Sequence, residues 1–332
     1  MKAMLAILAL ALASFQASAK VVALEAVSIP VSDLDRSVAF YTEVLDFKRI
    51  STAEIAGDDY EKAFGVFGTR ARVARLNLGG ESLELIQFVA PEGRAYPASA
   101  RSNDRSFQHV AIIVRDMAEA YARLRKHNVR HASSGPQKLP DWNPNAGGIE
   151  AFYFKDPDGH PLEILHFPEG KGAARWHATD RLFLGIDHTA IVTGRTDAST
   201  AFYGAALGMR KAGESENYGT EQEHLNNVFG ARLRITSMRA AMGPGVEFLE
   251  YLAPAGGRPA DDDTRANDLV AVTTILVSDD ADGDAKKLQA SGYEWVSPGT
   301  VTLNDRTLGF TKAATIKDPD GHFIRLVQGD TP

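Results

Sequence analysis

The chain has 332 residues, of which 44% are hydrophobic and 24% are charged, and it contains no cysteine. This composition is typical of a globular protein of about two domains and excludes a disordered, collagen-like or coiled-coil chain. The formal net charge of −7 argues against a nucleic-acid partner, and the lack of cysteine excludes disulfide scaffolds and thiolate zinc sites.

The first 19 residues predict a secretory signal peptide. Lys2 precedes an apolar run over residues 3–13, and Ala17 and Ala19 stand at positions −3 and −1 of a cleavage site before Lys20. A membrane anchor is the alternative, but the run is shorter than the roughly 20 residues that a span needs. We therefore expect a secreted or periplasmic protein, with no membrane association after cleavage behind Ala19.

Two units with the same order of elements follow this leader. Each begins with a strand of alternating polarity, continues with a helix opened by an aspartate, and ends in antiparallel strands. The predicted elements are, in chain order, a strand over 27–31, a helix from Asp33, strands over 72–78 and 82–88, a strand over 109–114, a helix from Asp116, and strands over 151–155 and 161–167.

The second half of the chain repeats the first. The hexapeptide Lys-Asp-Pro-Asp-Gly-His at 155–160 recurs at 317–322, and Phe40-Tyr41 recurs as Phe202-Tyr203, each pair 162 residues apart. The sequence therefore predicts two duplicated domains of two units each. Their expected ranges are 20–168 and 184–329, joined by a linker over 169–183, with third and fourth units over 184–252 and 269–328 and linkers between units over 91–105 and 254–268.

These motifs resemble the vicinal oxygen chelate superfamily, which includes glyoxalase I, methylmalonyl-CoA epimerase, extradiol dioxygenases and bleomycin-resistance proteins. The resemblance is carried by the segments 31–47 and 191–208, each with its Phe-Tyr pair, and by the two Asp-Pro-Asp-Gly-His turns. It implies an α+β fold in which four βαβββ modules form two half-barrel, glyoxalase-like domains around a metal or ligand. Fold alone does not identify the chemistry, because this fold hosts many activities.

The resemblance implies metal ligands at two places in each module, at the start of the first strand and in the middle of the last. The second module has His109 and Glu163 at these places, and the third has His188 and Glu247. Imidazole and carboxylate ligands without thiolate suit one divalent ion such as Fe, Mn, Ni or Zn.

The first and fourth modules lack a full set of ligands. The first has Ala26 and Glu84 at the two places, and the fourth has residues 271–273, none of which binds metal, and Arg325. Pairing the second module with the third, and the first with the fourth, gives one complete quartet and one silent site in which Glu84 can pair with Arg325. Pairing modules within each half gives two incomplete sites instead. We favour the first arrangement, because it explains why all four ligands lie in the two middle modules.

Other histidines and aromatic residues are weaker candidates. Tyr218 and His224 belong to a polar segment of the third module that can contact a substrate, although surface exposure is the simpler interpretation. Trp142 anchors the proline-rich segment 133–148, which is either a lid over the pocket or a rigid surface loop. His160 and His322 follow tight turns, and we expect both on the surface.

The resemblance implies a divalent-metal-dependent lyase or isomerase that acts on a small substrate with vicinal oxygens through a metal-stabilised enolate, with Glu163 or Glu247 as the base. One alternative is an extradiol Fe(II) ring-cleaving dioxygenase, which uses two histidines and one carboxylate. The other is a non-catalytic small-ligand or metal-binding protein of the bleomycin-resistance type. Lactoylglutathione lyase activity fits export poorly, since its thiol cosubstrate is cytosolic. The expected partners are a small-molecule substrate and at most a second copy of the chain, as a monomer or homodimer.

Overall fold

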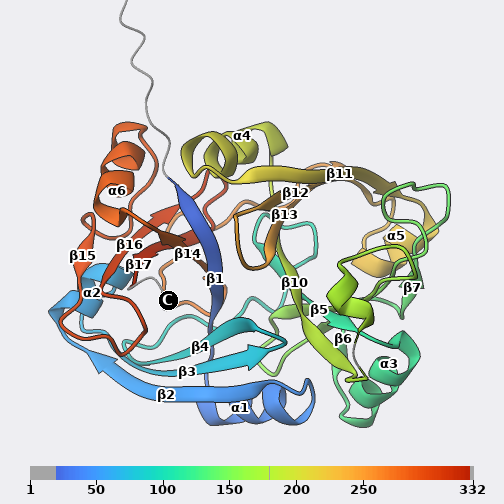
Figure 1. Cartoon of the computed structure of the whole chain (residues 1–332), viewed down its shortest axis with the longest axis horizontal. Helices are drawn as coiled ribbons and strands as arrows, with labels where there is room; N and C mark the ends of the chain where they lie inside the picture. Colours follow the sequence, from blue (N-terminus) through green and yellow to red (C-terminus); the bar gives the residue numbers. More distant parts are fainter. Residues whose placement is uncertain (1–19, 179, 330–332) are drawn as a thin grey trace, which may run out of the picture.

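The computed structural model describes residues 20–178 and 180–329, so the predicted signal peptide lies outside the described residues. Two curled sheets lie side by side, on the left and right of Figure 1, with helices along the upper and lower rims. No helix in these two ranges is long and apolar enough to cross a membrane.

The first sheet combines strands from the first and fourth modules. In spatial order it contains β15 (Val301–Thr302), β16 (Lys312–Lys317), β17 (Phe323–Gln328), β14 (Thr273–Ser278), β1 (Val21–Pro30), β4 (Glu81–Ala90), β3 (Arg70–Leu78) and β2 (Lys48–Ala56). The two modules meet at an antiparallel seam between β1 and β14, where Val27 lies opposite Thr274.

The second sheet combines strands from the second and third modules. It contains β11 (Arg210–Tyr218), β12 (Arg232–Arg239), β13 (Gly245–Ala253), β10 (Phe183–Val192), β5 (Phe107–Val114), β9 (Pro161–His166), β8 (Glu150–Lys155) and β6 (Arg130–His131), with β7 (Gln137–Lys138) beside β8. Its seam is the antiparallel pair β5 and β10, where Val110 lies opposite Thr189.

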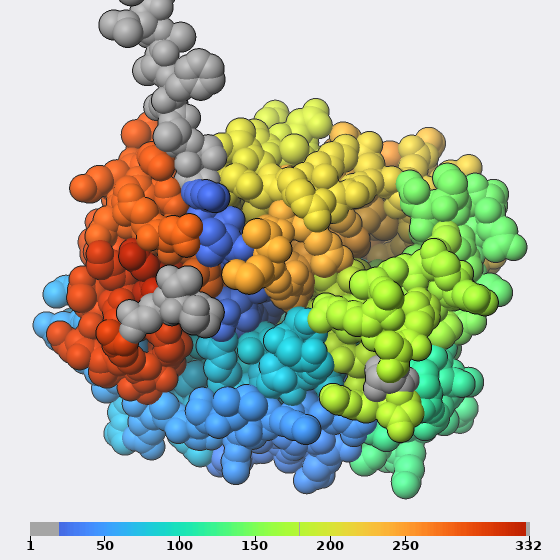
Figure 2. All heavy atoms as spheres, viewed as in Figure 1, coloured from blue at the N-terminus to red at the C-terminus, as the bar shows by residue number. Residues whose placement is uncertain are grey.

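Modules therefore pair two with three and one with four, as the distribution of candidate ligands predicts. Figure 2 shows the same arrangement on the surface, where the orange-red fourth module adjoins the blue first module and the yellow third adjoins the green second. The predicted α+β fold with two half-barrels is confirmed, and each half-barrel takes one module from each half of the chain.

Both helices that the sequence predicts begin where an aspartate side chain caps them. Asp33 accepts the backbone N–H of Arg36 at 3.0 Å and Asp116 accepts that of Glu119 at 2.8 Å, which confirms both predicted helix starts. The helices are α1 (Leu34–Glu43), α2 (Asp58–Phe64), α3 (Met117–Lys126), the 3₁₀ helix η1 (Ala174–His177), α4 (Thr196–Thr200), which continues as the π-helix η2 (Ala201–Ala206), α5 (Thr220–Asn226) and α6 (Ala281–Ala290).

The two sheets differ in what occupies their concave faces. We call the concave face of the first sheet the filled hollow, because Phe64, Phe88, Ile275 and Phe310 belong to one buried apolar cluster there. We call the concave face of the second sheet the metal hollow, which keeps a cavity of about 520 Å³. All four candidate ligands line the cavity of the metal hollow.

The prediction that His160 and His322 lie on the surface is wrong. Both side chains are buried, and the Nδ1 atom of each lies 2.9 Å from the aspartate that opens its turn, Asp156 or Asp318. Asp156 also accepts three backbone N–H groups of its turn, and the hydroxyl of Tyr41 lies 3.4 Å from it. These turns are buried because they pack between modules, which local turn propensity cannot show.

The two linkers between modules hold each other through reciprocal ion pairs, which we call the linker clasp. Arg94 of the first linker donates two hydrogen bonds to Asp268 of the second, at 3.0 and 2.7 Å. Arg258 of the second linker donates in the same way to Asp104 of the first. The backbones approach so closely that a Cβ at Gly93 would lie 1.7 Å from the carbonyl oxygen of Asn267, so glycine is required there.

The linker clasp predicts an acid-sensitive contribution to stability. Burial raises the pKa of Asp104 and Asp268, but the arginine side chains and backbone N–H donors lower it more, so both pKa values lie below the ordinary range. A carboxyl whose pKa is lowered on folding contributes stability above its unfolded pKa of about 3.9 and loses it as the pH falls through the folded pKa. We expect Arg258→Met to lower the free energy of unfolding by about 1 kcal/mol at pH 7, because the arginine is half exposed. Urea denaturation at pH 7 and pH 3 checks this, and a difference from the unaltered protein that is as large at pH 3 as at pH 7 would contradict it.

Candidate metal centre

The register of the second sheet brings four ligand-type side chains to one face. Across the seam, Ala190 lies opposite His109 and His188 lies opposite Ala111, so the two histidines lie close to each other on neighbouring strands. In the parallel pairs, Glu163 is the partner of Ala111 and Glu247 the partner of Ala190. Because side chains alternate along a strand, residues two apart share a face, and all four side chains point into the metal hollow.

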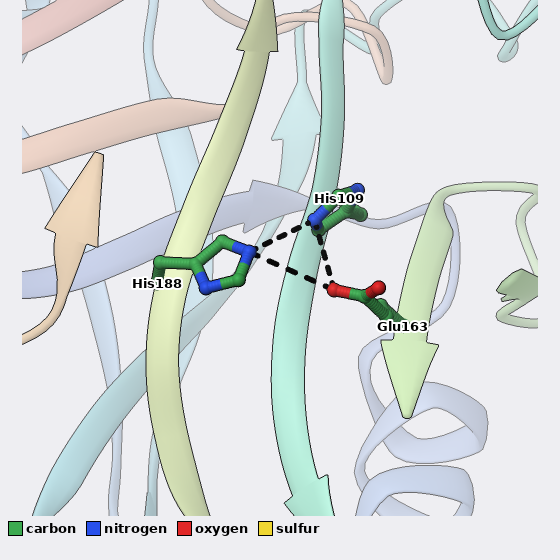
Figure 3. A group of neighbouring side chains, drawn as sticks. All are labelled: His109, Glu163 and His188. Atoms are coloured by element: carbon green, nitrogen blue, oxygen red, sulfur yellow. Dashed lines mark hydrogen bonds and ion pairs between the residues drawn. The ribbon is translucent and has the colours of Figure 1, made fainter. Parts of the chain in front are cut away.

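Three of the four side chains converge on one point. The Nε2 atoms of His109 and His188 lie 3.3 Å apart, and Oε2 of Glu163 lies 3.1 Å from the first and 3.6 Å from the second. Figure 3 shows the three groups pointing toward one another from β5, β9 and β10. Ligands about 2.1 Å from one ion stand about 3 Å or slightly more from their neighbours, so these separations suit a shared cation.

The protonation pattern of the two imidazoles also fits a metal ion. Nδ1 of His109 contacts Oε1 of Gln108, and Nδ1 of His188 lies 3.1 Å from a carboxylate oxygen of Asp187. Both oxygens are acceptors, so each Nδ1 carries a proton and each Nε2 is the nitrogen that faces the centre and can bind a metal ion. Oε2 of Glu163 is buried there without a hydrogen-bond partner. Three electron-rich atoms so close together require a cation or proton between them.

The electrostatic field of the metal hollow favours positive charge. Burial opposes a charge on His188, but Glu247, Asp187 and Glu163 together outweigh it and raise the pKa of His188 to about 9. The pKa of Asp187 is lowered despite its burial, because His188 and Arg239 contact its carboxylate. Asp187 thus orients the His188 ring while Arg239 holds Asp187.

Glu247 lies at the edge of this group. Its Oε2 is 3.4 Å from Nε2 of His188, and its Oε1 accepts the hydroxyl of Ser237. It does not belong to the set of ligand atoms that all lie within 4.8 Å of one another. The four predicted ligands therefore share one hollow, with three at the centre and Glu247 beside His188.

Sequence reasoning missed several residues of the cavity. Tyr153 packs its ring 4.9 Å from that of His109, and burial together with nearby Glu163 keeps its pKa well above the usual value, so it is a neutral phenol. Gln108 and Asp187 each directly precede a histidine, and this spacing is the signal that could have identified them. Asn217 and Gln222 line the far wall, and only the folded chain places them there.

The predicted silent site is an ion pair in the filled hollow. Nη1 of Arg325 lies 3.4 Å from Oε1 of Glu84, which also accepts the hydroxyl of Ser28 at 2.7 Å. The register places Ser28 opposite Glu84 and Ile275 opposite Arg325, the positions that carry Glu247 and Glu163 in the other sheet. Burial lowers the pKa of the Arg325 guanidinium, and the Glu84 carboxylate opposes this effect. A buried cation thus stands where the metal hollow has the carboxylate of Glu163.

The three weaker candidates lie outside the cavity wall. Trp142 stacks on Tyr218 with ring centroids 4.4 Å apart, and both rings are about half exposed. His224 is exposed, whereas its neighbours Gln222 and Leu225 line the cavity. The loop around Trp142 still contributes Asn145 and other residues to the wall, so the loop, rather than its tryptophan, borders the hollow.

Comparison with known proteins adds family relationships to this geometry. The Glyoxalase/Bleomycin resistance protein/Dioxygenase superfamily matches twice, over residues 23–164 and 185–326. A 2-epi-5-epi-valiolone epimerase from an Actinomyces species is 35% identical over 153 residues, which cover 45% of this chain and 81% of the relative. A lactoylglutathione lyase from Salmonella typhimurium is 32% identical over 151 residues, covering 44% of this chain and 90% of the relative. The crystal structure of glyoxalase I from Zea mays has a TM-score of 0.60 at 17% identity, covers 92% of each chain and supports the fold.

The geometry predicts one divalent ion per chain, held in the metal hollow. His109→Ala and His188→Ala each remove a converging nitrogen, so we expect either variant to lose retained metal, by at least about tenfold in affinity. Elemental analysis of the purified protein measures the stoichiometry directly.

Glu84→Gln is the matched control, because Glu84 lies at the corresponding place in the filled hollow. It should leave metal content unchanged while lowering stability by about 3 kcal/mol, since it leaves Arg325 buried without a carboxylate. Loss of metal from Glu84→Gln together with its retention by His188→Ala would show that the assignment of the two hollows is reversed.

Proposed function

Because the chain belongs to the Glyoxalase/Bleomycin resistance protein/Dioxygenase superfamily, we propose that it is a divalent-metal-dependent lyase or isomerase acting on a small substrate with vicinal oxygens. The observation that carries the proposal is the convergence of His109, Glu163 and His188, with Glu247 beside them, in a cavity large enough for a small molecule. The resemblance of slightly less than half of the chain to lyase and epimerase relatives supports the same reaction class.

The residues of the metal hollow have different roles in such a reaction. His109, His188 and Glu163 hold the ion, which when bound supplies Lewis-acid stabilisation of negative charge on substrate oxygens. Glu247 is the better candidate for the base, because it stands outside the three-residue centre and its side chain is more exposed than that of Glu163. The Ser237 hydroxyl holds one Glu247 oxygen, which leaves the other to accept a proton from a substrate carbon. Tyr153 offers a neutral hydroxyl on the same wall.

A second candidate rests on the same three residues. Two histidines and one carboxylate are the ligand set of non-haem Fe(II) oxygenases, and the group in which all atoms lie within 4.8 Å has this composition. An extradiol-type dioxygenase is therefore the alternative, and it requires Glu247 to stay off the metal. A non-catalytic small-ligand binder of the bleomycin-resistance type leaves the convergence of His109, Glu163 and His188 without a purpose.

Isotope exchange and oxygen uptake separate the two enzymes. With Mn²⁺, Ni²⁺ or Zn²⁺ we expect deuterium from D₂O to enter the carbon next to the carbonyl of α-hydroxy ketones, as measured by NMR. Glu247→Gln should slow this exchange by about 10²-fold or more, because an amide cannot accept the proton.

Glu250→Gln is the control on the same strand, since Glu250 faces Arg234 instead of the cavity. It should exchange at the rate of the unaltered protein. Oxygen consumption by the Fe²⁺-loaded protein with catechols, in the absence of deuterium exchange, would replace the lyase or isomerase assignment with the dioxygenase.

We also propose that the protein is exported and cleaved after Ala19. The charged, apolar and small-residue pattern of the first 19 residues supports this proposal. Expression in a bacterial host with the full leader should give a periplasmic protein whose intact mass corresponds to a chain beginning at Lys20. A cytoplasmic product of full length would contradict it.

A further inference from the structure

The duplication supplies an internal comparison for the part of the cavity wall that contains Asn217 and Gln222. Strand β2 and helix α2 of the first module correspond to β11 and α5 of the third module, 162 positions later. Three buried positions change from apolar or aromatic residues to amides. They are Ile55, Tyr60 and Phe64 in the filled hollow, against Asn217, Gln222 and Asn226 in the metal hollow.

In the filled hollow these positions form an aromatic core. Tyr60 and Phe64 stack with ring centroids 6.2 Å apart, and Phe64 meets Phe88 edge to face at 5.9 Å. The Arg325 guanidinium covers the other side of Phe64, 4.1 Å from its centroid. The fold therefore does not require amide side chains at these three positions.

In the metal hollow a hydrogen-bonded chain takes the place of the aromatic contacts. The amide NH₂ of Gln222 donates to Oδ1 of Asn226, whose NH₂ donates to the Tyr251 hydroxyl at 2.7 Å. Gln222 is only 2% exposed and lines the cavity, yet its Oε1 has no hydrogen-bond partner. A buried acceptor left unpaired costs about 1–3 kcal/mol, so a donor on a ligand would offset a cost that the filled hollow avoids.

The charged side chains on the rest of the wall already have partners, among them Glu214, which pairs with Arg234. The two arginines that line the cavity are already paired, Arg239 with Asp187 and Arg175 with Glu81. Asn217 uses its Oδ1 to accept from Asn143 and Ser215, which leaves its NH₂ as a donor. The wall thus offers neutral amide groups to a ligand.

We infer that Gln222 and Asn217 form a polyol-binding wall, and that the substrate is an uncharged, polyhydroxylated carbonyl compound. Gln222 Oε1 accepts a hydrogen bond from a substrate hydroxyl on a carbon beyond the two oxygens at the metal. This inference rests on the proposed function and adds the substrate class to it. Gln222 determines specificity, because an analogue without that hydroxyl leaves its oxygen unpaired.

Calorimetric titration of the Zn²⁺-loaded and Zn²⁺-free protein tests the inference with matched probes. The pairs are 2-keto-myo-inositol against 2-hydroxycyclohexanone, and dihydroxyacetone against hydroxyacetone. We expect the unaltered protein to bind the more hydroxylated member of the ring pair about tenfold more tightly or better. Gln222→Met should remove this preference, whereas Gln222→Glu, which keeps an acceptor, should retain it.

Tyr60→Phe is the matched control, since Tyr60 is the counterpart of Gln222 in the filled hollow, and it should leave both affinities unchanged. Two results with the unaltered protein would overturn the inference without use of the variant: equal affinity for both members of each pair, or no binding of either more hydroxylated probe. They hold even if Gln222→Met unfolds. A preserved preference in folded Gln222→Met would overturn it as well. If the protein discriminates between the probes but catalyses no deuterium exchange, the proposed reaction is wrong and the assignment of the polyol-binding wall is supported.

Discussion

The antiparallel seam between β5 and β10 is the constraint on which the site depends. It joins the second module to the third, and its register places His109 and His188 with their Nε2 atoms 3.3 Å apart. The parallel partners β9 and β13 then bring Glu163 and Glu247 to the same face. A shift of one residue at the seam would turn a histidine out of the hollow, because side chains alternate along a strand.

The same fold resolves the problem of buried charge in two ways. In the filled hollow, Glu84 is neutralised by Arg325 and the remaining space is closed by aromatic rings. In the metal hollow, the Glu163 carboxylate lies beside two imidazoles in an open cavity, where a bound cation would balance its charge. Duplication thus left one pair of modules as a packed core that supports the other pair. The two hollows differ in the side chains that face inward.

The two sheets are held together by contacts that repeat with the duplication. Tyr41 and Tyr203 point their hydroxyls at Asp156 and Asp318, the aspartates that also fix the buried turn histidines. The linker clasp adds ion pairs between segments that lie far apart in sequence. These contacts tie the two sheets together, so the first sheet supports the second sheet, which carries the site.

The four candidate ligands followed from the resemblance to the vicinal oxygen chelate superfamily, but the sequence by itself determined the duplication, the βαβββ order and the helix starts at Asp33 and Asp116. It could do so because repeats, capping residues and strand alternation are local patterns. Tertiary structure alone decided that His160 is buried, that Glu247 stands beside the three-residue centre and that Gln222 faces the cavity while His224 does not. Those outcomes depend on the packing of modules more than a hundred residues apart, and no local pattern carries that information.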